Sequence, residues 1–162
     1  MLSKTPSRRL FLLGLMALGG CGFAPVYGDD TVVLRGQIAF ETRDTVPGFR
    51  LRERLEQRLG VADAPVYVLR AQITDRRRSL AITTSGENQR FNVVGTVTWV
   101  LTHATTGETL ADGRHETFTS YAATGSTTAT QAAETDATAR LSVALADMIV
   151  SRLLLLAPDL PR

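Results

Sequence analysis

The side chains that could do catalytic or metal chemistry are few and poorly placed in this 162-residue sequence. Ser120, Asp112 and His115 all fall in one polar, strand-like segment, so they do not make a convincing nucleophilic triad. The other histidine, His103, would lie about 16 Å from His115 along the strands, too far to share a metal. The sequence also has no Gly-rich phosphate loop, no Gly-x-Ser-x-Gly elbow and no His-Glu-x-x-His motif. We therefore expect a protein that is not an enzyme and that uses no metal or cofactor.

Arginines form the most distinctive charged group. The run Arg76-Arg77-Arg78 lies in an extended segment, and Arg90 follows it across an expected hairpin. Guanidinium groups match phosphates and carboxylates better than ammonium groups do, and two of three neighbours share a face when the chain is extended. The four arginines therefore predict an anion-binding site. A solvated bulge would explain the same run without any ligand, and both interpretations stay open at this point.

A secretion signal precedes the single cysteine of the chain. Lys4, Arg8 and Arg9 form a basic start, an apolar stretch runs over residues 10–18, and two glycines precede Cys21. The apolar stretch is far shorter than the roughly 20 residues that a membrane-spanning helix needs. We therefore expect this leader to be removed on export.

The segment Leu18-Gly19-Gly20-Cys21 resembles a bacterial lipobox. The resemblance implies that Cys21 becomes the new N-terminus and carries a diacylglycerol thioether and a further acyl chain such as palmitate. Three acyl chains would anchor the protein firmly, because a single chain binds a membrane only marginally. Gly22 follows the cysteine instead of an aspartate, and by the lipoprotein sorting rule this implies the outer membrane. Arg8-Arg9 also resembles a twin-arginine motif, so Sec and twin-arginine export both stay open.

Charge and composition limit the class of protein. The chain has 18 basic and 16 acidic residues, but three basic residues lie in the leader, so the remainder is close to neutral. This balance argues against nucleic-acid binding. A hydrophobic content of 44% suffices for one packed domain, and the length is too small for two comfortable ones. We expect a signal peptide at 1–20, a lipidated tether at 21–30, a single α+β domain at 31–157 and a C-terminal tail at 158–162.

Hydrophobic periodicity predicts the elements of this domain in the order strand, helix, three strands, helix. The strands are expected at residues 32–40, 66–73, 91–101 and 109–121, and the helices at 49–59 and 127–156. Consecutive antiparallel strands with helices on one face give a two-layer α+β sandwich. Its sheet would be four-stranded and mainly antiparallel, with both helices on the same face.

The final helix is expected to be the principal core element. Its apolar stripe consists of Leu141, Leu145, Met148, Ile149, Leu153 and Leu156. Arg140, Asp147 and Arg152 argue against a membrane span. We expect Trp99 and Leu101 to lie beneath this stripe.

A change of phase marks the second strand. Apolar residues alternate from Tyr67 to Ile73, but Leu80 and Ile82 follow the opposite phase. Because a one-residue slip inverts the faces of a strand, we expect a bulge or break within residues 75–78. Such a break would turn the arginines out of the ladder and leave Asp75 as their only nearby carboxylate.

The start of the expected mature chain, Cys21-Gly22-Phe23-Ala24-Pro25-Val26-Tyr27-Gly28, resembles the LptE family of lipopolysaccharide-assembly lipoproteins. The short leader and the order of elements extend this resemblance over essentially the whole mature chain. It implies a non-enzymatic partner of the LptD β-barrel, lipid-anchored on the periplasmic side of the outer membrane. Such a protein plugs the barrel, supports its assembly and helps lipopolysaccharide to reach the outer leaflet.

The chain departs from the family at the tip of the sheet. Basic residues near this tip are thought to meet the glycolipid in the family, whereas residues 83–88 read Thr-Thr-Ser-Gly-Glu-Asn here. The candidates for binding lipopolysaccharide or the partner therefore shift to Arg76, Arg77, Arg78 and Arg90.

A second class of protein fits the same sequence. A barrel lumen is polar, so a plug needs a closed core and a polar, nearly neutral exterior, which this chain has. A periplasm-facing lipoprotein adaptor, or a small-ligand-binding module unrelated to lipopolysaccharide export, would have the same properties. Stable co-purification with a large β-barrel would distinguish the two classes.

Overall fold

The computed structural model describes residues 34–81, 89–123 and 126–161. Its elements are β1 (Ile38–Thr42), α3 (Val46–Leu59), β2 (Tyr67–Ala81), β3 (Gln89–His103), β4 (Thr109–Ala123), α4 (Thr127–Leu156) and a short 3-10 turn, η2 (Ala157–Asp159). Cys21, the leader, the tether and the tip at 83–88 lie outside the described residues.

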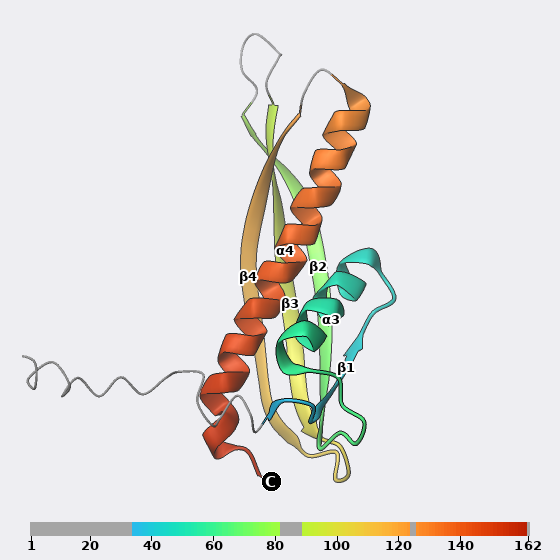
Figure 1. Cartoon of the computed structure of the whole chain (residues 1–162). Coiled ribbons are helices and arrows are strands. Elements are labelled where there is room, and N and C mark those ends of the chain that lie inside the picture. The colour runs from blue at the N-terminus through green and yellow to red at the C-terminus, as the bar shows by residue number, and fades with distance from the viewer. Residues whose placement is uncertain (1–33, 82–88, 124–125, 162) are drawn as a thin grey trace, which may run out of the picture.

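The four strands form one sheet in the order β1-β2-β3-β4. β1 is parallel to β2, and the β2–β3 and β3–β4 pairs are antiparallel. Both helices cover the same face of the sheet, and α4 crosses it diagonally (Figure 1). The predicted α+β class, the order of elements and the placement of the helices are confirmed.

The first strand is shorter than predicted and begins later, at Ile38. Gly36 has a φ of +71°, a conformation that favours glycine, and its N–H donates to the Leu59 carbonyl at 2.7 Å. The apparent alternation before Ile38 therefore belongs to a turn that contacts the end of α3. Leu34 in this turn is fully buried.

Helix α3 forms much as predicted. The Thr45 side chain caps its first turn by accepting from the Gly48 N–H at 3.2 Å, and Pro47 occupies an early position where no helical N–H is needed. Leu51, Leu55 and Leu59 recur every fourth residue and are buried. This stripe fixes the face that α3 turns towards the sheet and α4.

Helix α4 begins and ends where the sequence predicts. Of the predicted stripe, Leu141, Leu145, Ile149 and Leu153 are buried, whereas Met148 is 37% exposed, so its placement in the core was wrong. The buried face is shifted towards α3 and includes Ala137, Ser142, Ala146 and Val150. By length and composition α4 could cross a membrane, but its buried side packs against the sheet and α3.

An ion-pair cluster joins the two helices. Both carboxylate oxygens of Asp147 accept from Arg54 at 3.0 Å, and one also accepts from Arg58 at 3.1 Å. The hydrogen bonds from Arg54 to Asp147 raise the pKa of that guanidinium above its ordinary value. All three side chains are about one third exposed, so solvent weakens the cluster without abolishing it.

Removing this cluster should loosen the helix pair. We expect Asp147→Asn to lower the free energy of unfolding by about 1 kcal/mol, because two arginines lose a charged acceptor in a partly solvated site. Glu53→Gln is the matched control, since its pair with Arg50 is more exposed and lies within one helix. Chemical denaturation measures both. Equal losses of unfolding free energy in the two variants would show that the interhelical cluster stabilises the fold no more than an exposed ion pair within one helix does.

Candidate anion-binding surface

Strand β2 runs without interruption through the arginine run. Residues 75–78 pair with residues 92–95 of β3 in regular antiparallel register, and the irregularity falls later, between Ser79 and Ala81. The bulge or break predicted within residues 75–78 is therefore wrong. Arg76 and Arg78 fit this strand because their face of the sheet is open to solvent, and Arg77 on the other face is also exposed.

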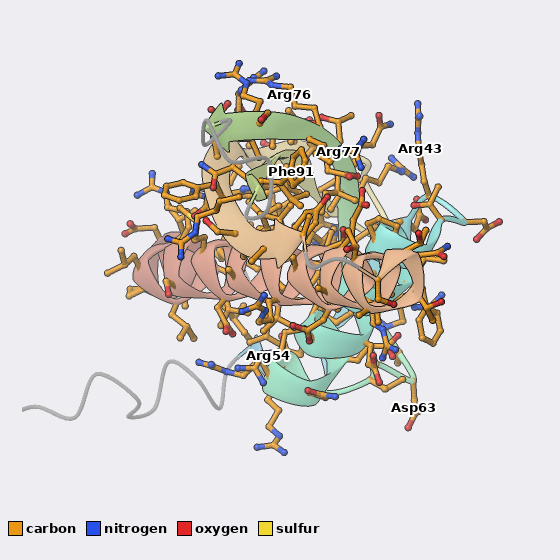
Figure 2. All side chains as sticks on the ribbon, turned by 90° about the horizontal axis from the view of Figure 1, so that it is seen from above. Arg43, Arg54, Asp63, Arg76, Arg77 and Phe91 are labelled. Atoms are coloured by element: carbon orange, nitrogen blue, oxygen red, sulfur yellow. The ribbon has the colours of Figure 1, made fainter. Side chains whose placement is uncertain are left out.

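Strand alternation divides the four arginines between two faces. Arg76 and Arg78 lie on the face that the helices leave open, and Figure 2 shows Arg76 on the far side of the sheet from α4. Arg90 lies on this open face as well, because it is two residues from Asn92, which pairs with Arg78. All three are exposed. We call Arg76, Arg78 and Arg90 the outer arginine patch.

Arg77 points the other way, towards α4 (Figure 2). Its guanidinium donates to Glu134 of α4 at 3.2 Å and lies 5.2 Å from the centre of the Phe91 ring, which stacks on Tyr121 at 5.4 Å. The pKa of Arg77 is raised, first by the nearby Tyr121 hydroxyl and then by Glu134. The expectation that Asp75 would be the only nearby carboxylate was therefore wrong for Arg77, which links three strands to α4.

The outer arginine patch borders an apolar side chain that the sequence analysis missed. Phe118 of β4 is 60% exposed, and it lies in one row of the sheet with Val94 and Arg76. The sequence feature that could have indicated it is a single aromatic residue between Glu116 and Ser120 on the most polar strand. The surface therefore combines positive charge with an exposed aromatic ring.

Acidic residues are sparse around this patch. No ion pair involves Arg76, Arg78 or Arg90 within the part of the chain that the structure describes. The next carboxylate along the face, Glu116, accepts from the Thr96 hydroxyl at 3.1 Å. Three exposed guanidinium groups without bound carboxylates can donate hydrogen bonds to phosphate or carboxylate oxygens of another molecule.

The polar residues considered for catalysis are separated by the sheet. His115 lies on the helix side, where its ring stacks on Trp99 at 6.3 Å, whereas Ser120 and Asp112 fall on the open face by strand alternation. The Ser120 hydroxyl donates to Asn92 at 2.6 Å. His103 accepts backbone N–H groups in the β3–β4 turn. In residues 34–81, 89–123 and 126–161, no group of three His, Cys, Asp or Glu residues could hold a metal ion.

Solved structures with the same arrangement come from bacterial lipoproteins. A protein described as a lipoprotein from Caulobacter crescentus superimposes with a TM-score of 0.69 at 24% identity, over 82% of this chain and 98% of that one. The rare lipoprotein B from Shewanella oneidensis gives 0.60 at 16%, over 76% and 97%. A minor lipoprotein from Acinetobacter baumannii gives 0.55 at 19%, over 74% and 91%. At these identities the likeness establishes the fold alone, a small α+β domain.

The family of this chain is identified by comparing its sequence with models of known protein families. The model of the LptE family, described as lipopolysaccharide-assembly, matches residues 36–153. No curated protein matches the chain significantly. The match extends from the turn before β1 almost to the end of α4, so the chain belongs to the LptE family and has a role in lipopolysaccharide assembly. The resemblance seen in the sequence is confirmed.

Proposed function

We propose that this protein binds and plugs the LptD β-barrel of the outer membrane, supports the assembly of that barrel and helps to deliver lipopolysaccharide to the outer leaflet. The observation that carries the proposal is the family match over residues 36–153, which includes every strand and both helices except the last three residues of α4. The match therefore covers the folded domain almost as a whole and is not confined to a short motif.

The exterior of the domain supports a plug. The open face of the sheet carries mainly polar and charged side chains, among them Gln72, Thr74, Thr98, Asp112 and Arg114. Such a face can lie against the polar wall of a barrel lumen without leaving large apolar areas in water. The opposite face is already covered by the helices, so the domain needs no partner to close its core.

Co-purification tests the partnership. We expect LptD to remain bound when the mature lipidated protein is purified in mild detergent from the cells that make it. An unrelated outer-membrane lipoprotein carrying the same leader and tag is the control. Recovery of this chain without LptD under conditions that keep barrels folded would contradict the proposal and favour a periplasm-facing adaptor or small-ligand-binding module.

The anchor is proposed to be Cys21, on the periplasmic side of the outer membrane. We expect mass spectrometry of the mature protein to show that residues 1–20 are absent and that a triacyl mass is added at Cys21. Cys21→Ser should abolish both changes while the domain still folds, because the matched family domain begins at residue 36, well after the cysteine. Recovery of an unmodified, water-soluble form from wild-type cells would contradict this assignment.

The ligand-binding role is proposed for Arg76, Arg78 and Arg90, with Arg77 holding the strands and α4 in place behind them. The three outer guanidinium groups would contact lipopolysaccharide phosphates or acidic residues of the barrel wall. Phe118 beside them offers an apolar contact for a ligand that also has acyl chains.

Neutralising the outer arginine patch should weaken binding strongly. A charge-assisted hydrogen bond contributes roughly 1.5–3 kcal/mol, so the triple Arg→Gln variant at positions 76, 78 and 90 should lose two or more orders of magnitude in lipopolysaccharide affinity if all three are engaged. The charge-matched control is the triple Arg→Gln variant at positions 50, 52 and 140, whose exposed ion pairs contribute little to stability. Folding is checked first by circular dichroism.

The two binding assays separate the outcomes. Loss of barrel co-purification with unchanged lipopolysaccharide binding would make the patch a protein interface and leave the glycolipid site elsewhere. Unchanged behaviour in both assays would mean that the three arginines are only solvated. An equal loss of lipopolysaccharide affinity in the control variant would show that only the change in net charge matters, and not the position of the three arginines.

A further inference from the structure

The C-terminal part of β2, beyond Ala71, has a free edge. β1 pairs only with residues Tyr67–Ala71 of β2, while β2 continues to Ala81. Beyond Ala71, no strand among the described residues pairs with this edge. A free edge is a row of unpaired N–H and C=O groups that can accept another strand.

The direction of the backbone identifies the free groups. The Tyr67 N–H donates to Gln37 on the side of β1, whereas the Val68 carbonyl accepts from the Thr102 hydroxyl of β3. Because this direction alternates along a strand, the odd-numbered residues of β2 face away from β3. The backbone groups of Ile73, Asp75, Arg77 and Ser79 therefore face the open edge.

The charges beside this edge select the occupant. Arg76 and Arg78 lie on the open face of the sheet, Arg77 lies on the other face, and the stretch Gln72–Ser79 contains one acidic residue, Asp75. A second copy of this chain would bring an identical arginine run against the first, and like charges across strands are unfavourable. Carboxylates two residues apart on an incoming strand would instead reach Arg76 and Arg78.

The other edge of the sheet lacks this property. On β4 the side chains beside the free edge alternate in charge through Asp112, Arg114 and Glu116. The Ser120 carbonyl on β4 also accepts from Arg140 of α4 at 3.4 Å. The β4 edge is therefore partly occupied and offers no single charge for a partner to complement.

We propose that the edge of β2 from Gln72 to Ser79 binds an extended polypeptide segment with carboxylates at alternate positions, as an added strand. Main-chain hydrogen bonds to Ile73, Asp75, Arg77 and Ser79 would supply affinity, and ion pairs with Arg76 and Arg78 would supply specificity. This site shares Arg76 and Arg78 with the outer arginine patch, but it goes beyond the proposed function because the free backbone edge of β2 defines it and its ligand is a polypeptide strand.

A synthetic peptide provides the probe: acetyl-Thr-Glu-Val-Glu-Val-Glu-Thr-amide, added to the mature lipidated protein in detergent. We expect binding by fluorescence anisotropy and at least tenfold slower hydrogen exchange at the amides of Ile73, Asp75, Arg77 and Ser79. The amide of Arg114, on the free edge of β4, should be unchanged. The same peptide with Lys in place of Glu should not bind.

Two N-methylated peptides distinguish strand addition from simple charge attraction. One carries N-methyl groups on both Val residues, and the other on the three Glu residues. Only one of these sets can face β2 in an added strand, so one peptide should lose binding and the other should keep it. Arg78→Glu should weaken the unmodified peptide about tenfold or more, whereas Arg114→Glu is the charge-matched control.

The proposal is overturned if the acidic peptide does not bind, if the Lys peptide binds equally well, or if binding leaves the four edge amides unprotected. It is also overturned if both N-methylated peptides bind like the parent. None of these outcomes touches the co-purification of LptD, so failure here is distinguishable from failure of the proposed function.

Discussion

Leu145→Ala is expected to lower the free energy of unfolding by about 2–5 kcal/mol, the range for truncating a buried leucine. Leu145 is fully buried in the middle of α4. The helix lies very close to the sheet at this point, because a Cβ on Gly95 of β3 would come within 3.2 Å of Leu145 Cδ1 and 2.6 Å of Leu141 Cδ2. The two surfaces therefore interlock, and truncation leaves a cavity that the rigid sheet cannot fill.

Chemical denaturation followed by the fluorescence of Trp99, the single tryptophan, measures this loss. Val143→Ala is the control on the same helix, since Val143 is 36% exposed and should lose much less. A loss below about 0.5 kcal/mol for Leu145→Ala, which is typical of surface substitutions, would show that the buried face of α4 has been assigned incorrectly.

Gly113→Ala is expected to cost about 1–3 kcal/mol, the range for overpacking a core. A Cβ at this position of β4 would lie 2.7 Å from two ring atoms of Trp99, Cε2 and Cζ2. The indole is 1% exposed and also stacks on His115, so it cannot move aside without disturbing the core. This position therefore requires glycine because there is no room for a Cβ beside Trp99, and not because the backbone needs the conformational freedom of glycine.

A second substitution makes this explanation testable. In a Trp99→Leu background the added methyl group meets a smaller side chain, so Gly113→Ala should cost much less there than in the wild-type chain. Asp112→Ala, exposed on the same strand, should change the free energy of unfolding by less than about 0.5 kcal/mol. An equal cost of Gly113→Ala in both backgrounds would assign the effect to the strand and not to the contact with Trp99.

The elements were predictable wherever apolar periodicity was unbroken. Helix α4 was placed correctly because its leucines repeat at helical spacing between a capping Ser126 and Pro158. Met148 was misplaced because the buried face of α4 is shifted towards α3, and periodicity alone does not show how far one helix turns towards the other. The first strand was extended too far because the residues around Gly36 alternate like a strand, although the backbone turns there.

The candidate surface was only partly predictable. The arginines were found by their number and spacing, but a run of charges carries no apolar phase, so the irregularity near Leu80 was placed several residues too early. The partner of Arg77, Glu134, is 57 residues away in sequence, and only the packing of α4 brings them together. Phe118 was missed because its neighbours on β4 are polar.

Depletion of this protein from the bacterium that makes it, followed by measurement of newly synthesised lipopolysaccharide at the cell surface, tests the account most directly. We predict a several-fold fall in the surface fraction, restored by the wild-type gene and not by a variant that no longer co-purifies with LptD. An unchanged surface fraction after complete depletion, with LptD still assembled, would contradict the role proposed here.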